Sequence, residues 1–204
     1  VSHAKMLGYE VSSPKSPRAT INISLATSKT TATMPAGTAF TTTVDDVSYQ
    51  FVTIADITGT NTGNAVPFDS TEIYEGSYVT TKYLVDSSDI DQRFILNSPR
   101  VDTTTLTVKG QTSADDASTT TYTKATDISQ LSRSSTVYFL HEIEVGRFEV
   151  YFGDGVVSQA LSDGNIVSLN YVITNKTQAN GASSFSSPSA IDTVTDVTIT
   201  TVAN

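Results

Sequence analysis

Apolar and polar residues alternate with a period of two along much of this chain. The pattern is clearest at 147–152, where Phe148, Val150 and Phe152 are separated by Glu149 and Tyr151. Successive side chains of a β-strand point to opposite faces of the sheet, so this alternation predicts a strand with one buried face. The same reasoning predicts strands over 18–26, 29–34, 40–44, 47–54, 93–97, 101–108, 137–143, 166–173 and 194–202, and one long strand or two short ones over 72–85.

The segment 136–182 combines three of these strands with the pairs Asp154-Gly155 and Asp163-Gly164. Glycine adopts the positive φ values that tight strand reversals need, so both pairs mark turns. The segment therefore predicts a β-meander, in which three consecutive strands lie side by side.

Residues typical of turns and loops interrupt the strands at 59–69, 86–91, 112–121 and 183–189. The start at Val1 and the sequence of 2–9 indicate the end of a helix that began in a longer polypeptide, and Pro14 and Pro17 prevent its continuation. We expect 1–17 to be this helix end and a linker, 18–111 to be a β-rich lobe, and 112–204 to be a C-terminal β-meander lobe. The predicted fold class is all-β or β-rich, with antiparallel meanders in one or two lobes and a short helical N-terminal end.

Composition supports strands and restricts the chemistry. Thr contributes 34 and Ser 26 of the 204 residues, a bias that suits strands and turns better than long helices. Cysteine is absent, which removes disulfides, thiolate metal ligands and a thiol nucleophile. No apolar run approaches the roughly 18 residues of a membrane-spanning helix, and the start lacks a signal-peptide pattern. We therefore expect no membrane partner.

The net charge of −9 argues against binding to nucleic acid, because that affinity comes from clustered Lys and Arg. The first 29 residues are mildly basic, with Lys5, Lys15, Arg18 and Lys29 against Glu10. This segment could dock on an acidic neighbouring copy, although a solvated surface with chance asymmetry is the simpler interpretation.

Catalytic and metal-binding candidates are few. The two histidines, His3 and His141, are far apart in the sequence, and His141 shares a strand face with Phe139, which predicts a packed histidine. Acidic clusters at 86–91 and 115–116 lack the spacing of a calcium loop, and Glu142, Glu144 and Glu149 are expected to face solvent. No nucleophile, phosphate-binding or zinc motif is present. We expect no enzyme activity, no catalytic residue, no cofactor, no metal and no small-molecule substrate.

Several spaced motifs carry a resemblance. YFGDG at 151–155 is followed by DGN at 163–165, then by an apolar strand, TN at 174–175 and ANGA at 179–182. In this order the elements resemble the baseplate J-like family of contractile-tailed phages, and within it the wedge components of the inner baseplate ring. MPAGTAF at 34–40 resembles the family's I-P-x-G-T-x-F turn, and 3–25 resembles the family's exit from a helical region into its first strand. The motif positions, which we expect to fix a hairpin, are Tyr151, Phe152, Gly153, Asp154, Gly155, Asp163, Gly164, Asn180 and Gly181.

The resemblance implies a structural protein of the virion, placed in the tail baseplate and assembled in the host cytoplasm. It implies that copies pair and close into a ring, and that this ring contacts other baseplate wedge proteins. A rival interpretation is a secreted or surface β-sandwich adhesin that binds glycan, since Ser/Thr richness, acidity and short strands fit it too. Tyr74, Tyr78 and Tyr83 could form a sugar-stacking platform, although tyrosines at this spacing are also ordinary cross-strand packing. Tryptophan, the strongest sugar-stacking residue, is absent.

Overall fold

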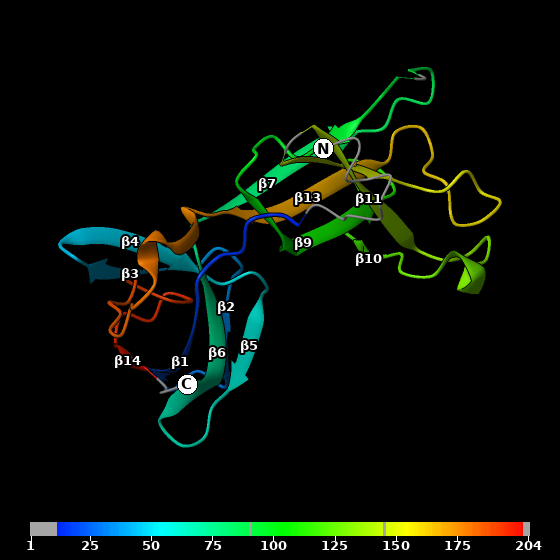
Figure 1. Ribbon diagram of the computed structural model, residues 1–204. Helices are drawn as coiled ribbons and strands as arrows, with labels where there is room; N and C mark the ends of the chain where they lie inside the picture. Colours follow the sequence, from blue (N-terminus) through cyan, green and yellow to red (C-terminus); the bar gives the residue numbers. More distant parts are fainter. Residues whose placement is uncertain (1–11, 90, 145, 202–204) are drawn as a thin grey trace. The chain divides into compact units, whose positions relative to one another are not determined.

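A computed structural model describes residues 12–89, 91–144 and 146–201 of the chain (Figure 1). Within these ranges the protein is β-rich, and helical structure is confined to two 3-10 turns, η1 at Ile128–Gln130 and η2 at Lys176–Ala179. The β-rich prediction is confirmed. The predicted helix at 2–9 lies outside the described residues.

The chain forms two compact units, each built from segments that are distant in the sequence. One unit comprises Val1–Pro14 and Thr80–Tyr171, and the other comprises Lys15–Val79 and Val172–Asn204. The sequence pattern instead predicted a boundary between two lobes, 18–111 and 112–204. The structure differs because 112–119 is the turn of a hairpin within one sheet, so no unit ends there.

The unit of Lys15–Val79 and Val172–Asn204 contains a five-stranded sheet with the order β14-β1-β6-β4-β3. The first segment supplies β1 (Arg18–Ala26), β3 (Ala39–Val44), β4 (Val47–Val52) and β6 (Ala65–Glu75), and the second supplies β14 (Val197–Thr201). A separate antiparallel pair joins β2 (Thr31–Met34) to β5 (Ile57–Thr60). The predicted loop at 59–69 therefore holds parts of two strands, because tertiary pairing outweighs its Gly, Asn and Pro content.

Strand β1 shows how the sequence pattern becomes a core. Ile21, Ile23 and Leu25 are at most 2% exposed and face a core that also contains Phe40 and Phe51, whereas the residues between them are half-buried or exposed. This unbroken alternation is the reason that the predicted bounds of 18–26 match the observed strand.

Glu75 ties the two segments of this unit together. Its carboxylate is fully buried and accepts hydrogen bonds from Thr174 Oγ1 at 2.7 Å, from the Asn175 backbone N–H at 2.9 Å and from Asn175 Nδ2 at 2.8 Å. Burying a carboxylate is costly unless such donors replace its water. Glu75 therefore requires the chain that follows Val172 to return to this position.

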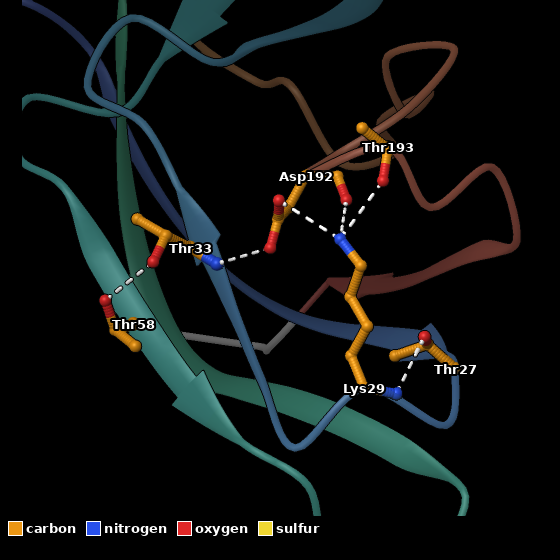
Figure 2. Close-up of polar contacts among 6 residues, drawn as sticks. All are labelled: Thr27, Lys29, Thr33, Thr58, Asp192 and Thr193. Carbon is orange, nitrogen blue, oxygen red and sulfur yellow. Dashed lines mark hydrogen bonds and ion pairs between the residues drawn. The ribbon is translucent and has the colours of Figure 1, made fainter.

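A second tie is the latch at Asp192, which Figure 2 shows. Lys29 Nζ lies 3.2 Å from Asp192 Oδ1 and also donates to the Asp192 carbonyl at 2.5 Å and to Thr193 Oγ1 at 3.0 Å. The other carboxylate oxygen, Oδ2, accepts from the Thr33 backbone N–H at 3.2 Å. The predicted loop at 183–189 also makes contacts within this unit, because Ser186 forms a β-bridge with Thr41 and Phe185 packs against Phe51.

A seven-stranded sheet has the order β7-β13-β9-β10-β11-β12-β8. Its strands are β7 (Ser77–Leu84), β8 (Phe94–Ile95), β9 (Val101–Gln111), β10 (Thr120–Lys124), β11 (Val137–Glu144), β12 (Arg147–Tyr151) and β13 (Ile166–Ile173). The predicted meander is thus only partly formed. β11 and β12 pair as an antiparallel hairpin, but β12 continues to β8 while β13 lies between β7 and β9.

Val137 is buried as the sequence indicated, but from Tyr138 to Glu142 strand β11 buries the opposite face. On β11, Tyr138 and Glu142 are buried, and Glu142 pairs with the buried Phe148 of β12. His141 has 61% of its side chain exposed. The predicted packed histidine is therefore wrong, as is the predicted solvent-facing Glu142, whose Oε1 accepts a hydrogen bond from the Gly146 N–H at 3.0 Å. On β12 the prediction holds: Phe148 and Val150 are buried and Tyr151 is exposed.

The latch predicts a pH dependence of stability. Hydrogen bonds from the Thr33 backbone N–H and from Lys29 hold the pKa of the Asp192 carboxyl below its ordinary value. A depressed pKa stabilises the folded state above the unfolded pKa, near pH 4, and this contribution is lost as the pH falls through the folded pKa. Asp192→Asn should therefore lower the urea midpoint at pH 7, and its difference from wild type should shrink below about pH 4.

Asp69→Asn, at an exposed aspartate on β6 of the same unit, serves as the control. Asp69→Asn should have the urea midpoint of the wild type. If Asp192→Asn also had that midpoint at every pH, the latch would not contribute to stability.

Candidate interaction surface

The motif YFGDG begins at the last residue of β12 and continues into the loop that leads to β13. Tyr151 points away from the core and stacks on Phe139, with ring centroids 5.1 Å apart and planes at 14°. Phe152 points the other way and makes edge-to-face contacts with Phe94 at 5.5 Å and with Tyr122 at 5.1 Å. Such pairs contribute about 0.5–1.5 kcal/mol beyond area burial. The two aromatic residues thus fix the start of the loop while exposing one ring.

The loop after Phe152 is tightly closed by its own backbone. Asp154 Oδ1 accepts hydrogen bonds from the backbone N–H of Val156 at 2.9 Å and of Val157 at 3.4 Å, and these bonds lower the pKa of Asp154. The Gly155 N–H donates to the Ser158 carbonyl at 3.0 Å, with Gly155 at φ +83°. The predicted positive-φ turn at Asp154-Gly155 is confirmed, although the turn lies within a loop and does not join paired strands.

Gly153 and Ser158 are in direct contact inside this loop. Ser158 is fully buried, and a Cβ atom at Gly153 would lie 1.9 Å from Ser158 Oγ and 2.7 Å from the Ser158 carbonyl oxygen. No side chain larger than hydrogen fits there without a shift of the loop. This close approach therefore requires glycine at position 153.

The remaining motif residues lie elsewhere. Asp163 Oδ1 accepts from the Ser87 N–H at 2.9 Å, and the Gly164 N–H donates to the Val85 carbonyl at 2.9 Å, with Gly164 at φ +77°. These contacts tie the loop to the segment after β7. Asn180 and Gly181 belong to the other unit and follow η2, with Gly181 at φ +94°. The motif is thus not one site.

An open hollow of about 440 Å³ lies beside the loop and has charged residues at its rim. Arg93 Nε donates to Glu149 Oε2 at 2.7 Å, and His141 Nδ1 lies 3.5 Å from Glu149 Oε1. Tyr151, Phe152 and Gly153 also line the hollow. Glu149 was predicted to face solvent, but only 17% of its side chain is exposed, because Arg93 and His141 lie against it.

Three exposed apolar side chains lie close together in the sequence at this loop. Val156 is 62% exposed, Val157 is 41% exposed and Tyr151 is 48% exposed, all within seven residues. Protein interfaces are enriched in aromatic residues and Arg, and a loop that is already ordered loses little entropy on binding. We call the set Phe139, Tyr151, Val156 and Val157 the loop patch. The sequence pointed to YFGDG but missed Val156 and Val157, whose exposure depends on the turn at Asp154.

The other candidate sites from the sequence have local roles. Asp86, Asp89 and Asp116 accept hydrogen bonds from residues two positions further along. In the described ranges, no three His, Cys, Asp or Glu side chains gather into a group that could hold a metal ion. Tyr74 and Tyr78 belong to an apolar cluster, and the Tyr83 hydroxyl donates to the Ile95 carbonyl at 2.7 Å, so these tyrosines do not form an exposed platform. None of the helical turns between residues 12 and 201 that the structure describes has the length and apolar character to cross a membrane.

The closure of the loop leads to a prediction about Gly153. Gly153→Ala should lower the free energy of unfolding by about 1–3 kcal/mol, the usual cost of overpacking, because Ser158 cannot move without breaking its bond to Gly155. Gly164→Asn is the matched control, since Asn tolerates positive φ and nothing lies within 4 Å of the Cβ position. Denaturant unfolding measures both. An unfolding free energy of Gly153→Ala equal to that of wild type would show that the loop is adaptable.

Comparison with known proteins adds one relation. No family model matches this chain. Over 185 residues the chain is 26% identical to the baseplate wedge protein gp6 of Enterobacteria phage T4, and the match covers 82% of this chain and 26% of that protein. The chain thus spans about a quarter of the length of this relative. This distant similarity supports a relation to phage baseplate proteins, whereas the resemblance to the baseplate J-like family stays a prediction.

Proposed function

We propose that this chain is a structural part of a baseplate wedge component in a contractile phage tail. The observation that carries the proposal is the similarity to gp6, which extends over 82% of the chain and so involves both units. In this proposal copies of the protein pair and form the inner baseplate ring, which contacts other wedge proteins in the virion. The protein works by assembly and requires no cofactor, nucleic acid, membrane or small-molecule substrate.

The contacts within the unit of Lys15–Val79 and Val172–Asn204 support a load-bearing role. Three sets of contacts close this unit: the hydrogen bonds of the buried Glu75 carboxylate, the latch between Lys29 and Asp192, and the pairing of β1 with β14. All of them join residues more than 90 positions apart in the sequence. Pulling on either segment must break several of these contacts together. Sheets closed in this way keep their surfaces in fixed positions, which an assembly needs in order to retain its neighbours.

The loop patch supports a contact with another baseplate protein. Val156 and Val157 project from a loop whose conformation is fixed by Asp154 and Gly153, while Arg93 and Glu149 lie beside it. This combination of apolar anchors with a charged rim is typical of an interface that forms between folded partners. We therefore assign the loop patch to a heterologous contact within the wedge.

Substitution on the loop patch tests this function. In phage particles whose wedge protein carries Val156→Asp and Val157→Asp, incorporation of that protein should fall at least about tenfold, because a charge buried without a partner at an interface costs 2 kcal/mol or more. Val47→Asp is the matched control, since Val47, the first residue of β4, is 50% exposed. Incorporation is measured by quantifying tail proteins in purified particles.

Two outcomes would contradict the proposal. The wild-type protein could be absent from purified tails, in which case binding to a glycan array would favour the adhesin. Alternatively, the loop-patch variant could be incorporated as well as Val47→Asp, which would remove the assigned contact.

A further inference from the structure

Strand β14 forms one end of the five-stranded sheet, and β1 is its only neighbour among the described residues (Figure 1). The pairing is antiparallel and continuous, from Leu25 opposite Val197 to Ile21 opposite Thr201. No bulge interrupts it, in contrast to the pairing of β1 with β6 on the other side. The outer edge of β14 is therefore regular over its whole length.

The hydrogen-bond pattern fixes which backbone groups point to that outer edge. The Ala26 N–H donates to the Asp196 carbonyl at 3.0 Å, so Asp196 faces β1. Residues of an antiparallel strand face their neighbours alternately, and Thr198 and Thr200 therefore also face β1. The backbone N–H and C=O groups of Val197, Ile199 and Thr201 point away from β1. These six groups form an open hydrogen-bonding edge.

The other ends of the five- and seven-stranded sheets carry features that discourage strand addition, and β14 does not. Thr41 at the β3 edge exchanges two backbone hydrogen bonds with Ser186, at 3.1 and 2.8 Å. β8 is only two residues long, and β7 carries Lys82. Natural edge strands are guarded by such short lengths, charges, prolines or bulges. The sequence VTITT of β14 contains no charge and no proline.

We propose that β14 pairs antiparallel with β14 of a second copy, centred on Ile199. In this register Ile199 lies opposite its own counterpart and Val197 lies opposite Thr201, so all six outward groups of each strand are used. Any shift by two residues leaves some of them unpaired. The self-complementary register is the reason to assign this edge to a second copy.

Side chains and charge favour the same arrangement. Val197 and Ile199 pack against the core but are only half-buried, so a second β14 would cover their outer sides. On the opposite face, exposed Thr198 would lie beside Thr200 of the other copy, a favourable cross-strand pair. Two chains of net charge −9 repel each other, but this strand carries no charge, and in the proposed register Asp196 does not lie opposite another aspartate. The proposal deepens the proposed function, because it rests on self-pairing and names its surface.

Cysteine cross-linking tests the register directly, because the chain has no cysteine of its own. Thr198→Cys and Thr200→Cys are prepared as separate proteins, since both side chains are exposed. In the proposed register Thr198 and Thr200 of different copies form a non-hydrogen-bonded pair with Cα atoms about 4.5 Å apart, within disulfide range. A mixture of the two variants under mild oxidation should give a disulfide-linked dimer on a non-reducing gel, whereas each variant alone should not.

Matched controls and the other outcomes keep the test decisive. A mixture of Thr41→Cys and Thr43→Cys, at two exposed positions on the opposite end of the sheet, should give no dimer. A dimer from Thr198→Cys alone or from Thr200→Cys alone would overturn the register centred on Ile199. If the chain dimerises in analytical ultracentrifugation but no mixture cross-links, the β14 pairing is wrong while self-pairing stands. If the chain stays monomeric at all concentrations and no mixture cross-links, both the β14 pairing and the self-pairing in the proposed function fail.

Discussion

The buried carboxylate of Glu75 is the interaction on which the second unit depends. This unit combines Lys15–Val79 with Val172–Asn204, and the intervening chain folds as the other unit. Glu75 lies near the end of the first segment, and its three hydrogen bonds come from Thr174 and Asn175, just inside the second. A misplaced second segment would leave a buried charge without donors, which costs several kcal/mol. The return of the chain at Val172 is thus strongly specified.

Later contacts extend this closure along the second segment. Phe185 packs on Phe51 with ring centroids 5.0 Å apart, Asp192 holds Lys29 and Thr33, and β14 completes the sheet beside β1. Each contact joins residues that are far apart in the sequence. The entropy lost in bringing the two segments together is therefore offset only when these contacts form together. A unit built in this way presents fixed edges and loops, which is the property that a role in assembly requires.

Sequence reasoning succeeded where a local pattern decides the structure. It predicted β1 because one face is buried along the whole strand, and it predicted the positive φ of Gly155 and Gly164 because Asp-Gly favours such turns. It failed where the outcome depends on distant partners. The insertion of β13 between β7 and β9 leaves no local signal, and His141 was misplaced because Phe139 packs on Tyr151 outside the core. The motif at 151–155 was visible, but the exposure of Val156 required the folded loop.

The most direct test of the account is electron microscopy of intact phage particles in which this protein carries a label at the turn between β3 and β4, where Asp45 and Asp46 are exposed. The account predicts label density in the tail baseplate, in a ring around its central hub and in symmetry-related pairs. Density confined to the fibres or the capsid, or particles without label, would contradict a structural role in the baseplate wedge.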